Sequence, residues 1–389
     1  IKSFLPFAKN CKMNNFETVY STFESAFGKP EVALSAAGRA NIIGEHTDYH
    51  EGFVLPFAID AAIYFCAAKN SKNKAEIISL DFGEKYDGSL EPAKGSWQLY
   101  VHGLLRDLQS KFQIQAEPTI VFGGNLPMGA GVSSSSALCC GLIEVMDSLY
   151  DLGLTSLQKV MWASEVEHGT GVRGGKMDQY AICHGQRGKA MLLDCRTLSH
   201  KELALPESWQ FLLLNTGVKH NLAFTAYNQR REEAENALAI IRQKFETVKT
   251  LRDVSLDQIN ACLEKDSLEY QRAIHVVSEN QRVKAFELCA QMGDIRNAGR
   301  LLNQSHASLR DHYQVSCDEL DFLQDQAMKK NSIFGSRMMG GGFGGCTISL
   351  IQEFDERDIQ EIRQAYHKKW GLLPDYHLVH PAPGLVHYD

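Results

Sequence analysis

The sequence predicts an α+β protein of two domains, and three observations carry this prediction. The chain has 389 residues, which exceeds the size at which a single hydrophobic core usually stops growing. Its first half mixes short strand patterns with helices, whereas residues 221–330 are mainly helical. Strand character then returns at residues 347–351. No flexible linker marks the boundary, which we place after residue 195, so that the domains cover residues 13–195 and 196–389.

Residue type and spacing indicate the individual elements. β-branched and aromatic residues favour strands, and apolar residues three or four positions apart favour helices. The predicted strands are residues 31–35, 59–67, 76–80, 119–122, 189–193 and 209–216. The predicted helices of the first half are residues 99–111, 137–146 and 156–168. In the helical second half, one helix face carries Tyr227, Ala234, Leu238 and Ile241.

Composition argues against several classes of function. A net charge of −7 disfavours a nucleic acid or an anionic membrane as the main ligand. Ten cysteines are scattered without a Cys-x-x-Cys pair, which predicts reduced thiols rather than a disulfide framework or a zinc site. No apolar run approaches the length that spans a membrane, and residues 4–7 are too short for the apolar region of a signal peptide. We therefore expect a cytoplasmic protein without nucleic-acid or membrane partners.

A loop rich in glycine and serine lies between a predicted strand and a predicted helix. It reads Met-Gly-Ala-Gly-Val-Ser-Ser-Ser-Ser-Ala over residues 128–137. Glycines let the backbone approach a ligand closely, and the start of the next helix offers unpaired N–H groups and a positive dipole end. The loop lacks the lysine of a Walker loop and the third glycine of a dinucleotide fingerprint. It is either another kind of phosphate-binding loop or a serine-rich turn that caps a helix.

A second segment, residues 38–49, reads Gly-Arg-Ala-Asn-Ile-Ile-Gly-Glu-His-Thr-Asp-Tyr and concentrates polar side chains. Glu45 and Asp48 can each accept two hydrogen bonds from hydroxyls, which is how vicinal hydroxyls of a sugar are held. Metal binding by Glu45, His46 and Asp48 is one alternative, although the His-Glu-x-x-His spacing is absent. A solvated polar turn is the other.

A third segment places glycine at four of the seven positions from Gly169 to Gly175, just before Asp178. Such a backbone can run tightly against a ligand and then present the aspartate, or the aspartate could simply cap a turn. Glu165 and Glu167 are two residues apart on the preceding predicted helix. Only one of them can therefore face this site, and we expect it to be Glu167.

Together these segments resemble the motifs of one family. Residues 38–49, 128–137 and 337–346 are similar to the three signature motifs of the GHMP small-molecule kinases. The first motif, followed by Gly-Phe-Val-Leu-Pro at residues 52–56, is typical of the galactokinase branch. Further matching segments are residues 215–220, 227–231, 272–277 and 305–311, so that the resemblance extends over nearly the whole chain from Thr18 onward. It implies the two-domain GHMP kinase fold, with the active site in the interdomain cleft and the last strand or strands returning to the N-terminal domain.

The resemblance also implies a role for each motif residue. Arg39 would stabilise the transferring phosphoryl group, and Asp178 would receive the proton of the sugar hydroxyl. The sugar would contact Glu45, His46, Thr47, Asp48, Gly175 and Tyr227. ATP would be bound by Trp97 beside the adenine and by Gly129, Ala130, Gly131, Val132, Ser133, Ser134 and Ser135 along the triphosphate. The ligands of Mg²⁺ would be Ser135 and Glu167.

The activity implied by this resemblance is ATP-dependent phosphorylation of the anomeric hydroxyl of D-galactose to galactose 1-phosphate, in galactose catabolism. The enzyme would be a monomer whose partners are a sugar and ATP. Two alternatives remain open: a 1-kinase for a related sugar (N-acetylgalactosamine, a uronic acid or L-arabinose) and a non-catalytic sensor of galactose and ATP. A uronic acid would require a cation, which Arg173 or Lys176 could supply. The loop from Glu167 to Asp178 is one residue shorter than in typical galactokinases.

Overall fold

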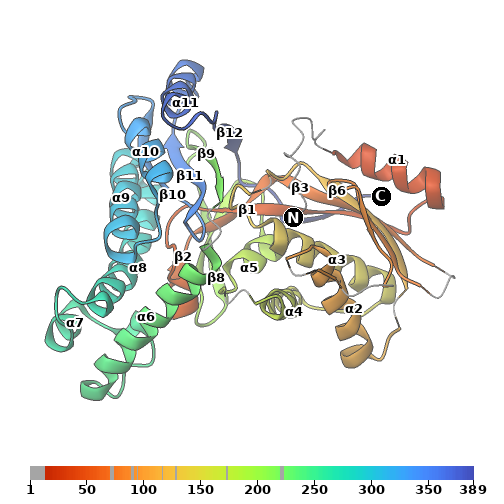
Figure 1. Ribbon diagram of the computed structural model, residues 1–389, viewed down its shortest axis with the longest axis horizontal. Helices are drawn as coiled ribbons and strands as arrows, with labels where there is room; N and C mark the ends of the chain where they lie inside the picture. The colour runs from red at the N-terminus through yellow and green to blue at the C-terminus, as the bar shows by residue number, and fades with distance from the viewer. Residues whose placement is uncertain are drawn as a thin grey trace, which may run out of the picture.

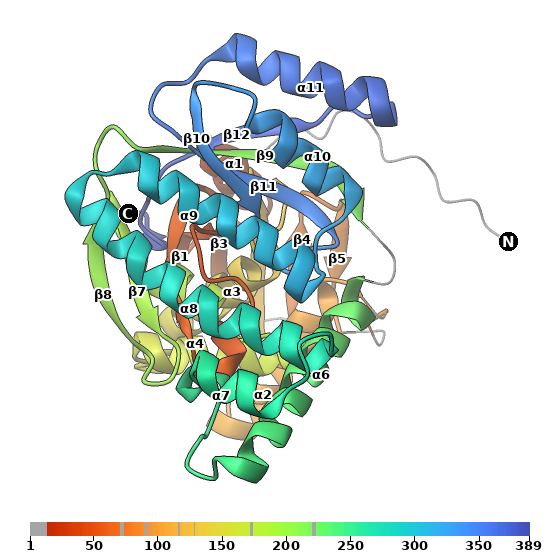
Figure 2. The same ribbon diagram turned by 90° about the vertical axis from the view of Figure 1, so that its left-hand side faces the viewer.

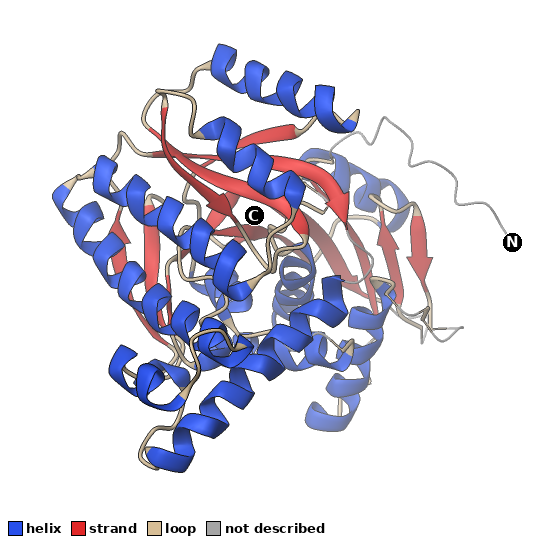
Figure 3. Cartoon of the chain, turned by 60° about the vertical axis from the view of Figure 1, so that its left-hand side comes forward, coloured by secondary structure: helices blue, strands red, loops and turns tan. Residues whose placement is uncertain are grey.

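The structure is a computed structural model that describes residues 14–70, 74–88, 92–93, 95–115, 117–127, 129–171, 174–219 and 223–389. Met128, which opens the glycine–serine loop, and Arg173 lie outside the described residues. Figure 1 shows a sheet with helices on both faces beside a second half dominated by helices. The strands run through the middle of the molecule with helices around them (Figure 3).

A six-stranded sheet forms the base of the first half. Its order is β13-β1-β3-β6-β4-β5, and all neighbours are antiparallel except the parallel pair β4 and β6. The strands are β1 (Val32–Asn41), β3 (Pro56–Lys69), β4 (Glu76–Ser79), β5 (Glu84–Tyr86), β6 (Pro118–Gly124) and β13 (Leu385–His387). The last strand of the chain thus pairs with the first strand of the sheet.

Helices cover both faces of this sheet (Figure 1). Helix α1 (Phe16–Phe27) packs on one face through Val19 and Phe23, which are one helical turn apart and fully buried. The other face is covered by α2 (Gln98–Phe112), α3 (Ser134–Tyr150), α4 (Ser156–Gly169) and α5 (Met177–His184). Helix α3 is buried along most of its length, which explains its continuous apolar sequence.

Strand β1 is longer than the sequence predicts. The strand was expected over residues 31–35, but it continues to Asn41 and is buried along almost its whole length. Its small residues, such as Ala36 and Ala37, are poor strand formers, yet both are buried, and the small side chain of Ala36 fits against Gly141 of α3. The register with β3 shifts between Ala37 and Arg39, a local irregularity that sets the direction of the Arg39 side chain. The other predicted elements of the first half are confirmed within a few residues.

The second half contains a four-stranded antiparallel sheet of order β10-β11-β9-β12. Its strands are β9 (Gln210–Lys219), β10 (Ile333–Met338), β11 (Gly344–Ile351) and β12 (Asp375–Val379). Leu212 and Leu214 of β9 pack against α10 (Asp318–Ala327) and α11 (Glu356–Trp370). The alternating residues Phe211 and Leu213 belong to the main core, which also contains the six-stranded sheet. One strand therefore joins the cores of the two halves.

The predicted helical region is confirmed. It comprises α6 (Ala223–Lys244), η2 (Leu251–Asp253), α7 (Leu256–Cys262), α8 (Leu268–Met292), α9 (Ile295–Ser308) and the π-helical turn η3 (Leu309–Tyr313). Helices α8 and α9 lie side by side (Figure 2) and pack against α6 and β10 respectively. Among the described residues, none of the helices combines the length and the apolar character needed to cross a bilayer.

A small third sheet of order β2-β7-β8 lies between these parts. It consists of β2 (Phe53–Val54), β7 (Lys189–Asp194) and β8 (Ser199–Ala204). The domain boundary proposed after residue 195 falls in the turn between the paired strands β7 and β8. That boundary stays a prediction.

Candidate active site

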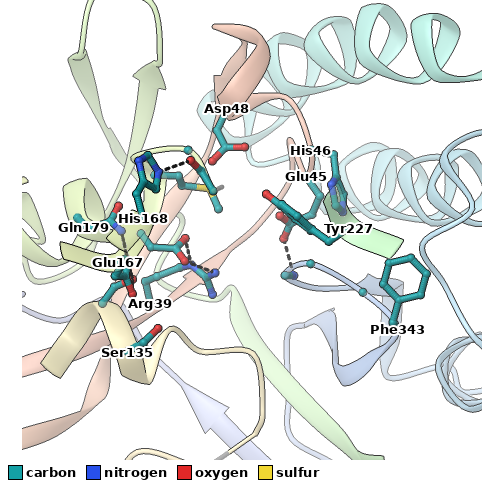
Figure 4. A pocket seen from close by; sticks show the side chains of 18 residues that line it. Arg39, Glu45, His46, Asp48, Ser135, Glu167, His168, Gln179, Tyr227 and Phe343 are labelled. Atoms are coloured by element: carbon teal, nitrogen blue, oxygen red, sulfur yellow. Dashed lines mark hydrogen bonds and ion pairs between the residues drawn. The ribbon is translucent and has the colours of Figure 1, made fainter. Parts of the chain in front are cut away.

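A cavity of about 300 Å³ brings together residues from both halves (Figure 4). This volume lies at the small end of the range for ligand pockets. The lining residues come from β1 and the loop after it, the start of α3, the junction of α4 and α5, α6, and the glycine turn before β11. They include Arg39, Glu45, His46, Asp48, Ser135, Ser136, Glu167, His168, Gly175, Asp178, Gln179, Tyr227, Gly340, Gly341 and Phe343. The structure thus unites the three sequence motifs at one site.

Arg39 and Asp178 form a bidentate ion pair in the wall of the cavity. Arg39 Nε and Nη2 donate to the two carboxylate oxygens of Asp178 at 2.6 and 2.9 Å. The hydroxyl of Ser133 donates to the same carboxylate at 2.5 Å, and Arg39 Nη1 donates to the carbonyl oxygen of Gly131 at 2.5 Å. Burial acts to lower the pKa of Arg39, but Asp178, Glu45 and Asp48 outweigh it and hold that pKa above its usual value. The guanidinium is therefore a permanent charge beside the glycine–serine loop.

The glycine–serine loop leads directly into α3. Gly129 and Gly131 have φ values of 77° and 71°, a conformation that favours glycine. Ser133 is the N-cap residue, but its backbone is left-handed (φ 59°) instead of extended, and its side chain makes no capping hydrogen bond; its hydroxyl donates to Asp178. The first N–H groups of α3 therefore have no side-chain cap, which leaves them available to an anion. Ser135, in the first turn of the helix, lines the cavity.

Glu45 is fixed by the glycine turn from the far end of the chain. Its Oε1 accepts a hydrogen bond from the backbone N–H of Gly340 at 2.8 Å and lies 3.2 Å from Nη2 of Arg337. Arg337 is fully buried and also donates to the carbonyl oxygens of Asn41, Ile42 and Met338. Its hydrogen bonds connect β10 with the end of β1, and its guanidinium fixes the position of the Glu45 carboxylate. The sequence motif included Arg337, but its supporting contact was not predicted.

Asp48 and Gly175 are in direct contact across the cavity. A Cβ atom added to Gly175 would lie 1.9 Å from Oδ2 of Asp48, so any side chain here would displace the carboxyl. Burial raises the pKa of Asp48 to about 7, and the nearby carboxylates of Asp178 and Glu45 add to the shift. Gly175 thus allows the glycine-rich segment to approach Asp48, a contact that the sequence analysis did not predict.

His46 and Tyr227 form an aromatic wall of the cavity. Their ring centroids are 5.4 Å apart, and His46 Nδ1 lies 2.6 Å from the hydroxyl of Tyr49. Burial lowers the pKa of His46 to about 3, so this ring is neutral at neutral pH. Tyr227 comes from α6, which is why the helical half is needed to complete the cavity.

Glu167 is buried and faces the start of α3, while Glu165 points away. The hydroxyl of Ser136 lies 3.0 and 2.9 Å from the two carboxylate oxygens of Glu167, and Gln179 Nε2 also donates to this carboxylate. Burial raises the pKa of Glu167 to about 7. Glu165 is exposed and pairs with Lys111, which confirms the predicted difference between the two glutamates. Ser136 and Gln179 were missed, although each directly follows a predicted site residue.

Several predicted residues do not line the cavity. Residues 129–134 of the glycine–serine loop are outside its lining, although Gly131 and Ser133 contact Arg39 and Asp178, which line it. Thr47, Trp97 and Lys176 are outside the lining as well. Thr47 is buried and its hydroxyl lies 2.8 Å from the carbonyl oxygens of both Gly44 and Phe53, so it stabilises its own loop. The indole N–H of Trp97 donates to Glu84 at 2.8 Å. Lys176 is the N-cap residue of α5 and is not among the lining residues. A contact of Trp97 with adenine stays a prediction.

The alternative of a metal site formed by Glu45, His46 and Asp48 finds no support. No group of three histidine, cysteine, aspartate or glutamate side chains in the described part of the chain could hold a metal ion. Glu45 is instead bound to Gly340 and Arg337, and His46 to Tyr49. The cavity therefore combines carboxylates that can accept hydrogen bonds from hydroxyls with a neighbouring helix start, at α3, whose N–H groups have no side-chain cap.

Comparison with known proteins identifies the class. Residues 100–186 match the family model for the GHMP kinases N terminal domain, and residues 283–371 match the GHMP kinases C terminal model. Residues 21–69 match the galactokinase galactose-binding signature. The fold and the site define a GHMP kinase, as the motifs implied.

Individual relatives narrow the class. The galactokinase of Roseiflexus sp. (strain RS-1) is 35% identical over 370 residues, which cover 93% of this chain and 95% of the relative. The galactokinase of Chloroflexus aggregans is 36% identical over 349 residues, 87% of this chain and 89% of the relative. The crystal structure of Lactococcus lactis galactokinase complexed with galactose matches with a TM-score of 0.88 and 29% identity, covering 95% of this chain and 99% of that chain. The chain belongs to the galactokinase family.

Proposed function

We propose that this protein transfers the γ-phosphoryl group of ATP to the anomeric hydroxyl of D-galactose. The observation that carries the proposal is the position of the Arg39–Asp178 pair. It lies between a cavity whose carboxylates can hold sugar hydroxyls and a helix start that can hold phosphates. The galactokinase galactose-binding signature over residues 21–69 includes Arg39, Glu45 and Asp48 and supports galactose as the sugar.

Galactose would be held by the carboxylates of Glu45 and Asp48 and by the hydroxyl of Tyr227. Each ionised carboxylate can accept hydrogen bonds from two hydroxyls, which fixes both the position and the identity of a sugar face. Because Gly175 has no side chain, it leaves the carboxyl of Asp48 in place, and His46 packs against Tyr227. Thr47 would act indirectly, since its hydroxyl bonds within the loop that carries Glu45 and Asp48.

Asp178 would orient the anomeric hydroxyl and accept its proton. Phosphoryl transfer passes through a loose transition state, so positioning and charge neutralisation matter more than strong basicity. Arg39 lies beside Asp178 and the carbonyl oxygen of Gly131, where it would neutralise negative charge on the transferring group. Gly129 to Ser135 and the first N–H groups of α3 would bind the triphosphate.

The residues near Glu167 fit a Mg²⁺ ion that accompanies ATP. No basic side chain among the described residues pairs with this buried carboxylate, and Oε1 of the adjacent Gln179 has no hydrogen-bond partner among them. Mg²⁺ prefers oxygen ligands and takes few of them from the protein, which matches Ser135 and Glu167. When bound, the ion would neutralise charge on the phosphates. Gln179 and Ser136, which hydrogen-bond to Glu167, would hold this ligand in place.

A coupled assay of ADP release with a panel of sugars tests the proposal. We expect galactose to give the highest kcat/KM, above N-acetylgalactosamine, galacturonic acid and L-arabinose at equal concentration. Absence of galactose-dependent ADP release would reject the proposed function. Binding of galactose and ATP without turnover would instead indicate a sensor.

The proposal includes a monomeric state and a cytoplasmic location. Light scattering coupled to size-exclusion chromatography tests the monomer, for which the chain mass of 43.5 kDa is the expected value. A mass near twice that value would reject it.

A further inference from the structure

We propose that Tyr313 is a positioning residue for galactose binding, which acts through Tyr49 and His46 on the loop that carries Glu45 and Asp48. This inference rests on the proposed function of the cavity. Tyr313 lies outside the three sequence motifs and belongs to the π-helical turn η3 of the helical half. Its side chain is fully buried, and it does not line the cavity itself.

The hydroxyl of Tyr313 joins a short chain of hydrogen bonds behind the cavity. It lies 3.0 Å from the hydroxyl of Tyr49, which in turn lies 2.6 Å from Nδ1 of His46. It also lies 3.4 Å from Nε2 of His50. The loop from His46 to His50 is therefore bound to Tyr313 at three of its side chains, either directly or through Tyr49.

The ring of Tyr313 packs between two histidines. Its centroid lies 4.9 Å from that of His46 and 4.6 Å from that of His275. Nε2 of His275 lies 3.1 Å from the carbonyl oxygen of Glu45, and a carbonyl only accepts, so this nitrogen carries the proton. Nδ1 of His275 is then the acceptor for the hydroxyl of Ser308 at 2.9 Å. Tyr313 thus lies between the contacts that fix Glu45 and those that fix His46.

The backbone of the loop requires such support. His46 has a φ of 60° and Glu51 has a φ of 58°, both in the left-handed region that is unfavourable for residues other than glycine. Glu45 precedes the first of these residues, and Asp48 lies between them. Relaxation of either residue would move the carboxylates that are proposed to hold galactose. The buried network offers a physical reason why the strained conformation persists.

The network carries no net charge at neutral pH. Burial lowers the pKa of His46 and of His50 to about 3 and that of His275 to about 4, so all three rings are neutral. Neutral hydrogen bonds depend on geometry and are insensitive to salt. Removal of one hydroxyl therefore perturbs position without creating a buried charge.

The test compares Tyr313→Phe, Tyr49→Phe and the double variant with the wild type. Phenylalanine keeps the ring packing and removes only the hydroxyl. We expect each single change to raise the galactose KM and the galactose Kd about three- to tenfold. The kcat at saturating galactose and the KM for ATP should stay within about twofold, because Arg39, Asp178 and the glycine–serine loop are not part of the network. In the double variant the galactose Kd should rise no further than in the more strongly affected single variant, since both hydroxyls act in one chain of hydrogen bonds.

Tyr270→Phe is the matched control. The hydroxyl of Tyr270, on α8, donates to Asn260 at 3.0 Å on the surface, outside the network. Its galactose KM and Kd should equal those of the wild type. Equal increases in the control and in Tyr313→Phe would overturn the proposal. Additive effects of the two network changes, or a lower Tm with an unchanged galactose Kd, would overturn it as well.

A measurement independent of turnover separates this proposal from the proposed function. In ¹⁵N-histidine NMR spectra of the protein without ligands, Tyr313→Phe should shift the Nδ1 resonance of His46, whereas Tyr270→Phe should not. An unchanged His46 resonance would overturn the network even in an active galactokinase. A shifted resonance in a protein that turns over no galactose would reject the proposed function and retain the network.

Discussion

Arg39 and Asp178 are separated by 139 positions in the chain, yet their side chains form one unit. Arg39 lies on β1 and Asp178 lies in the first turn of α5, and these two elements pack against each other. The carboxylate of Asp178 accepts from two guanidinium nitrogens and from Ser133. These donors fix the orientation of Asp178 before any substrate binds, which is the condition for efficient proton acceptance from a bound hydroxyl.

Asp178→Asn should lower kcat about a hundredfold or more and leave galactose binding nearly unchanged. The amide keeps the shape of the side chain but cannot accept the proton, and it leaves Arg39 without its counter-ion. Steady-state kinetics and calorimetric titration with galactose measure the two quantities. Thermal unfolding provides the control, because a variant that is unfolded at the assay temperature would lose both. Near-wild-type turnover would remove Asp178 from the mechanism.

Asp48 predicts a pH dependence of galactose binding. With a pKa of about 7 in the free protein, its carboxyl is mostly protonated at pH 6, whereas sugar hydroxyls donate to the ionised form. The galactose Kd should therefore be constant above about pH 8 and about tenfold larger at pH 6, since only about one tenth of the carboxyl is then ionised. Calorimetry between pH 6 and 8.5 measures this, and Asp48→Asn should flatten the profile. A wild-type Kd that does not change over this range would contradict the assignment.

The raised pKa of Asp48 also predicts that the stability of the fold decreases as pH rises, whereas the affinity for galactose increases. The folded protein holds the Asp48 proton more tightly than the unfolded chain, so this titration stabilises the fold below about pH 4 and the contribution is lost as pH rises through about 7. The Tm of Asp48→Asn relative to the wild type should therefore increase from pH 5 to pH 8. An equal difference in Tm at both pH values would show that the carboxyl is not destabilised by burial.

At the scale of single elements, helix α4 presents its two glutamates to different environments. Glu167→Ala should raise the Mg²⁺ concentration needed for half-maximal activity and lower kcat, because it removes one of the few protein ligands proposed for the ion. Glu165→Ala is the matched control on the same helix and should be nearly silent, since Glu165 is exposed and pairs with Lys111. Activity measured against Mg²⁺ concentration tests both variants. Unchanged Mg²⁺ dependence in Glu167→Ala would show that the ion is bound elsewhere.

Helix α8 fixes the loop after β1 from the other half. Glu279 accepts from the backbone N–H of Gly44 at 3.0 Å and from the hydroxyl of Ser305 at 2.6 Å, while Asn280 accepts from the N–H of Phe53 at 2.7 Å. Burial acts to raise the pKa of Glu279, but Arg282 and its other donors outweigh burial and lower it to about 2. The glutamate is therefore ionised at neutral pH. One face of α8 thus holds both ends of the loop.

Glu279→Gln should raise the galactose KM and reduce the free energy of unfolding by about 1–3 kcal/mol, the usual scale for hydrogen bonds to a charged group. The amide can accept only through one oxygen, so it cannot serve Gly44, Ser305 and Arg282 as the carboxylate does. Denaturant unfolding and galactose kinetics measure the two effects. Glu287→Gln on the same helix weakens the pair with Lys201 and keeps an oxygen that can accept from Gln291; both contacts lie outside the loop, so this change should affect neither quantity. Equal behaviour of the two variants would show that α8 does not hold the loop.

The sequence predicted the helices and strands of this fold better than the contacts between them. Residue type and apolar spacing were enough to find α2, α4 and the strands β3, β4, β6, β7, β9 and β11, because those elements pack against a hydrophobic core. The short strands β2 and β5 and the strands β8, β10, β12 and β13 were not predicted. The prediction ended β1 too early, because alanine has a low propensity for strands and the end of this strand is stabilised by packing against α3. Glu279 and His275 look like polar positions of an exposed helix in the sequence. Only the packing of α8 against the loop shows that they are buried.

At the scale of the whole molecule, the cavity needs both halves of the chain. The first half supplies Arg39, Glu45, Asp48 and Asp178, and the second supplies Tyr227 and the glycine turn around Gly340. The motifs indicated Arg39, Glu45, Asp48 and Asp178 because each motif concentrates glycine or polar side chains over a few positions, whereas Tyr227 was assigned to the site only by the family resemblance. The supporting residues outside the motifs, such as His275, Glu279 and Tyr313, are scattered over the second half. Their roles arise from long-range contacts, which no local pattern encodes.

The central claim is that this molecule phosphorylates the anomeric oxygen of galactose, and identification of the product tests it most directly. Purified protein with ATP, Mg²⁺ and ¹³C1-labelled galactose is followed by ³¹P and ¹³C NMR. We predict one phosphorylated sugar whose phosphorus couples to the labelled carbon, formed in equal amount to ADP, and no such product with Asp178→Asn on the same time scale. A phosphate attached to another carbon, or ADP formed without a sugar phosphate, would contradict the account.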